Sequence, residues 1–158
     1  AMMEWAIKQK KHPVAIKMPT KDVPEGKEIT AVDYSEIKYD IKPGKDVAVL
    51  ALGDMYDMLG KKVAEKTGAS LVNPVSANIL DTAALDKLTQ ENKVIVTIED
   101  NILDGGFGEK VASYLGDKDI KVLNYGQKRV YTDQVPLKEI LKDNRMTVDQ
   151  IVEDIENA

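Results

Sequence analysis

The sequence contains no cysteine among its 158 residues and a single histidine, His12. The absence of cysteine excludes disulfides, thiolate nucleophiles and cysteine-bound zinc, and it favours a reducing compartment such as the cytoplasm. One histidine without any cysteine makes a transition-metal site unexpected. His12 precedes a proline and is interpreted as a solvated side chain, with no catalytic triad assembled around it. We therefore predict no metal ligands and no catalytic residues in this chain.

Long apolar runs are missing as well. No segment approaches the ~20 consecutive apolar residues that a membrane-spanning helix needs, and no signal-peptide pattern opens the chain. The formal net charge is -5, whereas nucleic-acid binding requires a concentrated basic face. The short basic runs at residues 8–11 and 61–62 are typical of solvated helix faces. Neither a membrane nor a nucleic acid is expected as a partner.

The chain divides into unequal parts. Residues 1–22 predict a helix at 3–9 and a strand at 14–16, which together cannot bury their apolar faces. This piece is interpreted as the incomplete tail of a preceding domain. Residues 23–44 are rich in proline, glycine and charge, as a linker is, although weak alternation at 35–41 predicts an edge strand.

From residue 45 to residue 158 the pattern alternates between strands and helices. Short apolar runs predict buried strands at 47–52, 69–72, 94–98 and 120–123. Helices are predicted after Asp54 and Asp81, at 109–115, and after Pro136 and Thr147. Such alternation is typical of right-handed βαβ units. The predicted fold is a three-layer α/β/α domain with a mostly parallel sheet.

Glu99 and Asp100 directly follow the predicted strand at 94–98. Ligands of open α/β sheets bind at the carboxyl ends of strands, so these carboxylates are candidates for acid/base catalysis or for binding a divalent metal. A carboxylate in this position also commonly ties down the next loop by accepting backbone N–H hydrogen bonds. The second interpretation is the one we favour.

The run Gly105-Gly106-Phe107-Gly108 precedes a predicted helix. Glycines there expose N–H groups at the positive end of the helix, where a phosphate can bind. The spacing matches neither a dinucleotide fingerprint nor a P-loop. A tight turn packed under Phe107 is the simpler interpretation, and on spacing alone it is favoured.

Taken together, the residues from Val94 to Gly108, which read VIVTIEDNILDGGFG, resemble the "VTVEEN…GGFG" segment of the 1-deoxyxylulose-5-phosphate synthase family. Less specific matches lie in the right order around it, at residues 12–19, 49–53, 80–81 and 122–126. The resemblance implies that residues 45–158 form a transketolase C-terminal-like domain. It also implies that residues 1–22 are the end of the family's pyrimidine-binding domain.

Members of that family use thiamine diphosphate and a divalent metal, usually magnesium. They decarboxylate pyruvate and join the two-carbon unit to glyceraldehyde 3-phosphate, in isoprenoid precursor synthesis. The resemblance places the cofactor and its activating glutamate in upstream domains, so the fragment itself is expected to hold no cofactor and to be inactive. Its implied partners are the upstream domains of the same polypeptide and, in a homodimer, a second copy.

Several positions depart from the family pattern. Arginines suited to a substrate phosphate are replaced by Lys17, Thr20 and Val75. Lys17 is the one candidate phosphate ligand that remains. The residues of the family motif are expected to be structural: Glu99, Asp100, Asn101, Gly105, Gly106, Phe107 and Gly108.

Two alternatives stay open at this point. The chain is also compatible with the C-terminal domain of a transketolase or of a 2-oxoacid dehydrogenase β subunit. A stand-alone interaction domain without a catalytic role is the second alternative.

Overall fold

The computed structural model describes residues 1–18 and 33–158. The chain divides into two compact units, Ala1–Ile37 and Lys38–Ala158, which are described separately. The predicted linker 23–44 and the predicted tail 1–22 both extend into residues outside the described part. The second unit begins at Lys38, and its first strand precedes residue 45.

The first unit contains helix α1 (Met2–Lys8), close to the predicted 3–9. The indole Nε1 of Trp5 donates to Asp33 Oδ1 at 2.9 Å, and the Trp5 ring lies edge-on to Tyr34 with centroids 5.8 Å apart. The α1 helix buries none of its residues. The strand predicted at 14–16 is wrong, because these residues pair with no described strand and remain irregular.

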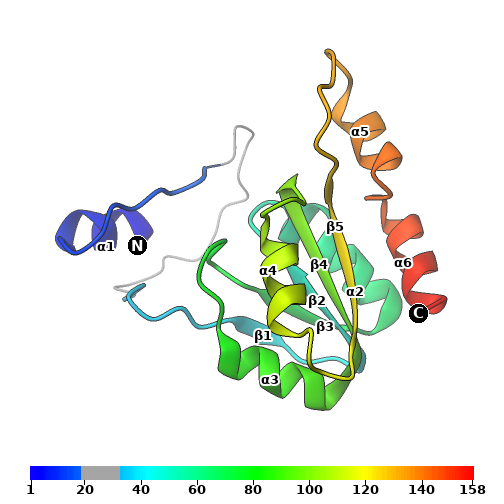
Figure 1. Cartoon of the computed structure of the whole chain (residues 1–158), viewed down its shortest axis with the longest axis horizontal. Helices are drawn as coiled ribbons and strands as arrows, with labels where there is room; N and C mark the ends of the chain where they lie inside the picture. Colours follow the sequence, from blue (N-terminus) through cyan, green and yellow to red (C-terminus); the bar gives the residue numbers. More distant parts are fainter. Residues whose placement is uncertain (19–32) are drawn as a thin grey trace. The chain divides into compact units, whose positions relative to one another are not determined.

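The second unit is built on a five-stranded sheet in the order β1-β3-β2-β4-β5 (Figure 1). The strands are β1 (Asp40–Lys42), β2 (Asp46–Ala51), β3 (Ser70–Asn73), β4 (Asn92–Ile102) and β5 (Lys121–Gln127). The last four run parallel, and β1 pairs with β3 in the antiparallel sense. The predicted edge strand at 35–41 is thus shorter and shifted to 40–42.

Helices cover both faces of this sheet, as a three-layer α/β/α fold requires. They are α2 (Lys61–Thr67), α3 (Thr82–Glu91), α4 (Phe107–Tyr114), α5 (Leu137–Asp143) and α6 (Val148–Glu156). On β4, Val94, Val96 and Ile98 belong to the core shared with α2 and α6. Because side chains alternate along a strand, Ile95, Thr97 and Glu99 face the layer of α3 and α4. The predicted α/β class and layer arrangement are confirmed.

Two of the three helix caps predicted from the sequence are present in the structure. Asp81 caps α3 by accepting from the N–H of Ala84 at 3.0 Å, as predicted. Thr147 and Gln150 form the predicted capping box of α6. Asp54 is not a side-chain cap, which corrects the prediction. A π-helical stretch, η1 (Tyr56–Gly60), opens that helix, and the N–H of Met58 bonds the backbone carbonyl of Asp54 instead.

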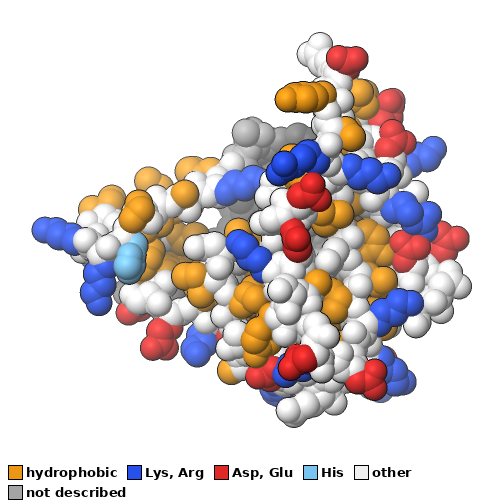
Figure 2. Space-filling model, in the orientation of Figure 1, with side chains coloured by type: hydrophobic (Ala, Val, Ile, Leu, Met, Phe, Trp, Pro, Cys, Tyr) orange, Lys and Arg blue, Asp and Glu red, His pale blue; other side chains and the backbone are white. Residues whose placement is uncertain are grey.

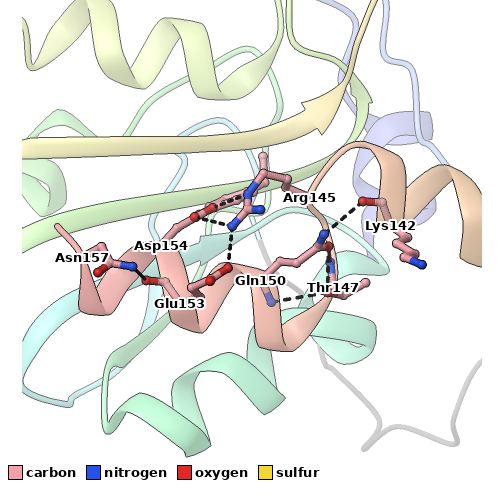
Figure 3. Close-up of polar contacts among 8 residues, drawn as sticks. Lys142, Arg145, Thr147, Gln150, Glu153, Asp154 and Asn157 are labelled. Carbon is pink, nitrogen blue, oxygen red and sulfur yellow. Dashed lines mark hydrogen bonds and ion pairs between the residues drawn. The ribbon is translucent and has the colours of Figure 1, made fainter.

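A polar network joins α6 to β5 and to the turn before the helix (Figure 3). The guanidinium of Arg145 donates to both carboxylate oxygens of Asp154, at 3.1 and 2.6 Å, and to Glu153 at 2.8 Å. The hydroxyl of Tyr125 donates to Asp154 at 2.9 Å. Burial raises the pKa of Tyr125, and its acceptor Asp154 raises it further. Arg145, together with Tyr125, lowers the pKa of Asp154.

The network predicts a pH-dependent stability. A carboxyl group whose pKa is lower in the folded state stabilises the fold above its ordinary pKa, and that contribution is lost as the pH falls through the folded value. We expect Asp154→Asn to lower the free energy of unfolding at neutral pH by about 1 kcal/mol, since Arg145 is half exposed and solvent screens the pair. Urea unfolding should show this difference shrinking below about pH 4.

The matched control is Glu156→Gln, which removes an exposed carboxylate from the last turn of the same helix. Its unfolding free energy should stay unchanged across the same pH range. A loss equal to that of Asp154→Asn would mean that the general charge of α6, and not the bidentate pair, carries the effect.

Candidate functional site: the turn from β4 to α4

Glu99 lies at the carboxyl edge of the sheet, inside β4, with only 1% of its surface exposed. Its Oε2 accepts a hydrogen bond from the N–H of Phe107 at 3.0 Å, and its Oε1 accepts one from Gly108 at 2.8 Å. These are the first two residues of α4. The carboxylate therefore takes the place that an external anion occupies at other helix N-termini.

The glycines of the turn are explained by this geometry. A Cβ at Gly106 would lie 2.6 and 2.7 Å from the Glu99 carboxylate oxygens, and a Cβ at Gly108 would lie 2.5 Å from Thr97 Oγ1. Gly105 has φ +72°, a conformation that strains other residues. The exposed side chain of Glu109 accepts from the N–H of Gly105. The turn thus packs directly over β4, with Phe107 only 1% exposed beneath it.

The turn's own residues take up the donors that a bound phosphate would need. Phe107 and Gly108 donate to Glu99, Gly105 donates to Glu109, and the N–H of Gly106 donates to the carbonyl of Leu103 at 2.8 Å. Phosphate binding at the turn, one of the two interpretations of the glycine run, is not supported by this arrangement. The arrangement matches the tight turn packed under Phe107.

The same contacts bear on acid/base chemistry. A general acid or base must reach the proton it transfers, but both oxygens of Glu99 are engaged inside the protein. Asp100 is half-buried and Asn101 is exposed, so neither shares the enclosed position of Glu99. The structural role of the family motif stays a prediction. Its main support is the pair of hydrogen bonds that Glu99 accepts from α4.

The topological switch point lies between β2 and β4, since the chain passes from β2 to β3 on one side and then to β4 on the other. Open α/β sheets bind ligands there. The ammonium of Lys110, on α4, donates to the carbonyl of Ala77 at 3.3 Å, linking α4 to the loop after β3. In that loop Val75 has φ +65°, a rare conformation for a β-branched residue.

The positions at which the family pattern has phosphate-binding arginines hold Lys17, Thr20 and Val75 in this chain. Lys17 is an exposed residue of the first unit, and Thr20 lies outside the described residues. Val75 supplies no charge. In the part of the chain that the structure describes, no group of three or more His, Asp or Glu side chains is placed to hold a metal ion.

The surface of the second unit carries both signs of charge. Figure 2 shows basic and acidic side chains interspersed over its visible face. Exposed pairs such as Lys66 with Asp149, at 2.7 Å, contribute to this mixture. Across residues 1–18 and 33–158, no helix has the length and apolarity that crossing a membrane would require.

Sequence reasoning missed a polar pair beneath α4. The hydroxyl of Thr97, fully buried in β4, donates to Asn124 Oδ1 of β5 at 2.7 Å. Gly108 packs against both side chains. The available signal was a polar residue at matching positions of two otherwise apolar strands.

The comparisons with known proteins agree with this architecture. The family model described as "Transketolase, C-terminal domain" matches residues 35–151. The solved structure of a split-gene transketolase, an inactive β4 tetramer, superposes with a TM-score of 0.70 at 24% identity, covering 80% of this chain and 44% of that one. At that identity it shows the fold alone.

Two sequence relatives are enzymes called 1-deoxy-D-xylulose-5-phosphate synthase. The 1-deoxy-D-xylulose-5-phosphate synthase of Clostridium acetobutylicum is 33% identical over 139 residues, which cover 80% of this chain and 22% of that protein. The enzyme of the same name from Pseudoalteromonas translucida is 36% identical over 118 residues, covering 72% and 19%. The chain thus spans about a fifth of the length of these relatives. It belongs to the family of transketolase C-terminal domains.

Proposed function

We propose that this chain is the C-terminal domain of a thiamine-diphosphate-dependent enzyme of the 1-deoxyxylulose-5-phosphate synthase type. Its own role is structural: it packs against upstream domains of the same polypeptide and contributes to a homodimer. The parent joins pyruvate and glyceraldehyde 3-phosphate in isoprenoid precursor synthesis. The cysteine-free sequence suits a reducing cytoplasm.

One observation carries the structural role. The carboxyl edge of the sheet, where a doubly wound domain normally binds its ligand, is held together by the domain's own Glu99 carboxylate on the first turn of α4. Because both of its carboxylate oxygens accept backbone hydrogen bonds, Glu99 stabilises the turn and does not contact a substrate. The sequence relatives support the choice of parent, since they are synthases in which this segment is only about a fifth of the chain.

Thiamine diphosphate and magnesium do not fit the described residues. A diphosphate needs free N–H donors or cationic side chains, and the donors at the start of α4 are taken by Glu99 and Glu109. Magnesium needs convergent oxygen ligands, and the described residues contain no group of three or more His, Asp or Glu side chains able to hold a metal ion. We assign both to the upstream domains.

Lys17 is the proposed ligand for the acceptor's phosphate. It occupies a position where the family has an arginine, and an ammonium contacts phosphate as a point charge without the bidentate geometry of guanidinium. With Val75 in place of a second arginine, the parent's acceptor pocket differs from that of the family. On this basis the parent is proposed to be a divergent member of the family, with a changed acceptor or none.

Transketolase and the 2-oxoacid dehydrogenase β subunit are the alternatives within the family, and a stand-alone interaction domain is the alternative outside it. The order of domains encoded upstream discriminates among them. Thiamine-binding domains preceding this segment in one reading frame support a synthase, whereas a start codon just before Met2 with no such domains supports an interaction domain.

The structural role predicts that the purified chain has no catalytic activity of its own. The purified chain should catalyse no condensation of pyruvate with glyceraldehyde 3-phosphate, and isothermal titration should detect no binding of thiamine diphosphate in the presence of magnesium. The polypeptide of the complete reading frame is the positive control. Turnover by the chain alone would show that it holds a catalytic site, and the structural role would be wrong.

The capping role of Glu99 predicts that removing one of its carboxylate oxygens destabilises the domain. In Glu99→Gln the amide nitrogen must face an N–H of Phe107 or Gly108, so a buried donor loses its acceptor. We expect the free energy of unfolding to fall by roughly 2–3 kcal/mol. Urea unfolding followed by circular dichroism measures it.

Glu109→Gln is the matched control, since it makes the same exchange in the same turn at an exposed carboxylate. The Gln carbonyl still accepts from Gly105, so stability should change little. If the Glu99→Gln variant were as stable as the unsubstituted chain, the capping role of Glu99 would be refuted.

A further inference from the structure

Asp104 is the only aspartate or asparagine in the 158-residue sequence that a glycine follows. Asp104 and Gly105 are both exposed, and a Cβ placed on Gly105 would meet no described atom within 4 Å. Because glycine carries no side chain to shield its nitrogen, that nitrogen can attack the side-chain carbonyl carbon of the aspartate before it. The pair therefore has the groups and the access that a rearrangement of the main chain needs.

The rearrangement balances with water as its one co-reactant. The Gly105 nitrogen bonds to Cγ of Asp104, and its proton leaves with the hydroxyl of the protonated carboxyl group as one molecule of water. The product is a five-membered succinimide ring. Water then adds to either ring carbonyl and breaks its bond to nitrogen. One route restores aspartate, and the other gives isoaspartate, in which the main chain runs through the former side chain and is one methylene longer.

The native turn opposes this reaction. The N–H of Gly106 donates to the carbonyl of Leu103 at 2.8 Å, which closes a β-turn with Asp104 and Gly105 at its centre. Gly105 has φ +72°, and Asp104 is not among the residues of positive φ, which is the pattern of a type II turn. Such a turn sets ψ of Asp104 at about +120°. Ring closure needs the Gly105 nitrogen to eclipse Cβ of Asp104, so it requires a large rotation of ψ and the loss of the turn.

Side chains hold both reacting groups in the native turn. The carboxylate of Glu109 accepts the N–H of Gly105, which is the group that must lose its proton. The Nε of Arg129 lies 3.6 Å from Oδ2 of Asp104, in an exposed pair of the kind that contributes little. Glu109 is therefore the main side-chain restraint on the reacting nitrogen.

We propose that Asp104–Gly105 is a latent isoaspartate site, whose reaction is gated by opening of the turn from β4 to α4. The rate in the folded chain is then the rate of the open turn multiplied by the fraction of molecules in which the turn is open. The product cannot close the turn in its native form, because the longer main chain must fit beside Gly106, where even a Cβ would lie 2.6 Å from Glu99 Oε1. Isomerisation therefore turns a transient opening into a permanent loss of the Glu99 cap.

Peptide mapping tests the site, and it is independent of the activity of any parent enzyme. The whole chain is incubated at neutral pH, folded and in guanidinium chloride, and is then digested with trypsin. The tryptic peptide 94–110 also contains Asp100 and Asn101, which larger residues follow, as internal controls. Electron-transfer fragmentation, which distinguishes isoaspartate from aspartate, should find isoaspartate at residue 104 in denaturant and at least several-fold less in the folded chain. No isoaspartate at residue 104 in denaturant, or equal rates in the two states, overturns the proposal.

Glu109→Ala tests the gate, because it removes the acceptor of the Gly105 N–H. Isoaspartate at residue 104 should form several-fold faster in the folded variant than in the folded unsubstituted chain, with no difference in denaturant. Glu109→Gln is the matched control, since it keeps an acceptor for Gly105 and should react at the rate of the unsubstituted chain. Equal folded rates for Glu109→Ala and Glu109→Gln would refute gating by this turn.

Asp104→Glu tests the consequence for the fold. It keeps the charge but cannot form the five-membered ring, so incubation should leave its stability unchanged. The incubated unsubstituted chain should contain a fraction that unfolds at lower urea concentration, and this fraction should match the isoaspartate content. Equal losses of stability in both chains would mean that isomerisation does not release the Glu99 cap.

Discussion

The carboxylate of Glu99 lies buried beneath the first turn of α4, and the carboxyl edge of the sheet depends on it. An ionised carboxylate in the interior costs several kcal/mol unless its oxygens are bonded. Here the N–H groups of Phe107 and Gly108 supply those bonds, and the positive end of the helix favours the charge. The lack of a Cβ at Gly106 is what lets the turn approach so closely.

The commitment of Glu99 has consequences for function. The position that carries ligand in many α/β domains is filled by the protein, and Lys110 links the neighbouring loop to α4. The domain has the architecture of transketolase C-terminal domains. At the carboxyl edge of its sheet, Glu99 holds the start of α4 against β4. A structural role of this kind is consistent with the chain matching only about a fifth of the length of its sequence relatives.

On the face of the sheet covered by α2 and α6, a second set of contacts holds strand β5 in place. Tyr125 is anchored by Asp154, which Arg145 holds in a bidentate pair, so β5 is fixed from the α6 side. Asn144 caps the strand where it ends.

Local physics made much of the fold predictable. The apolar run at 94–98, the Asp81 cap and the Thr147 capping box act within a few residues, and the structure has all of them. Local patterns also misled. The run at 14–16 resembles a strand, but a strand forms only when a neighbouring strand pairs with it. At Asp54 the N–H of Met58 bonds the backbone carbonyl, so the side chain caps no helix.

The sequence by itself determined the class of fold, the family and the segment of interest, because periodicity and the order of motifs are written along the chain. It left open whether Glu99 faces a ligand or its own loop. Only the tertiary structure decided that, because the partners of Glu99 lie eight and nine residues onward across a turn. The pairing of Arg145 with Asp154 and of Thr97 with Asn124 was decided the same way, by helix and strand placement.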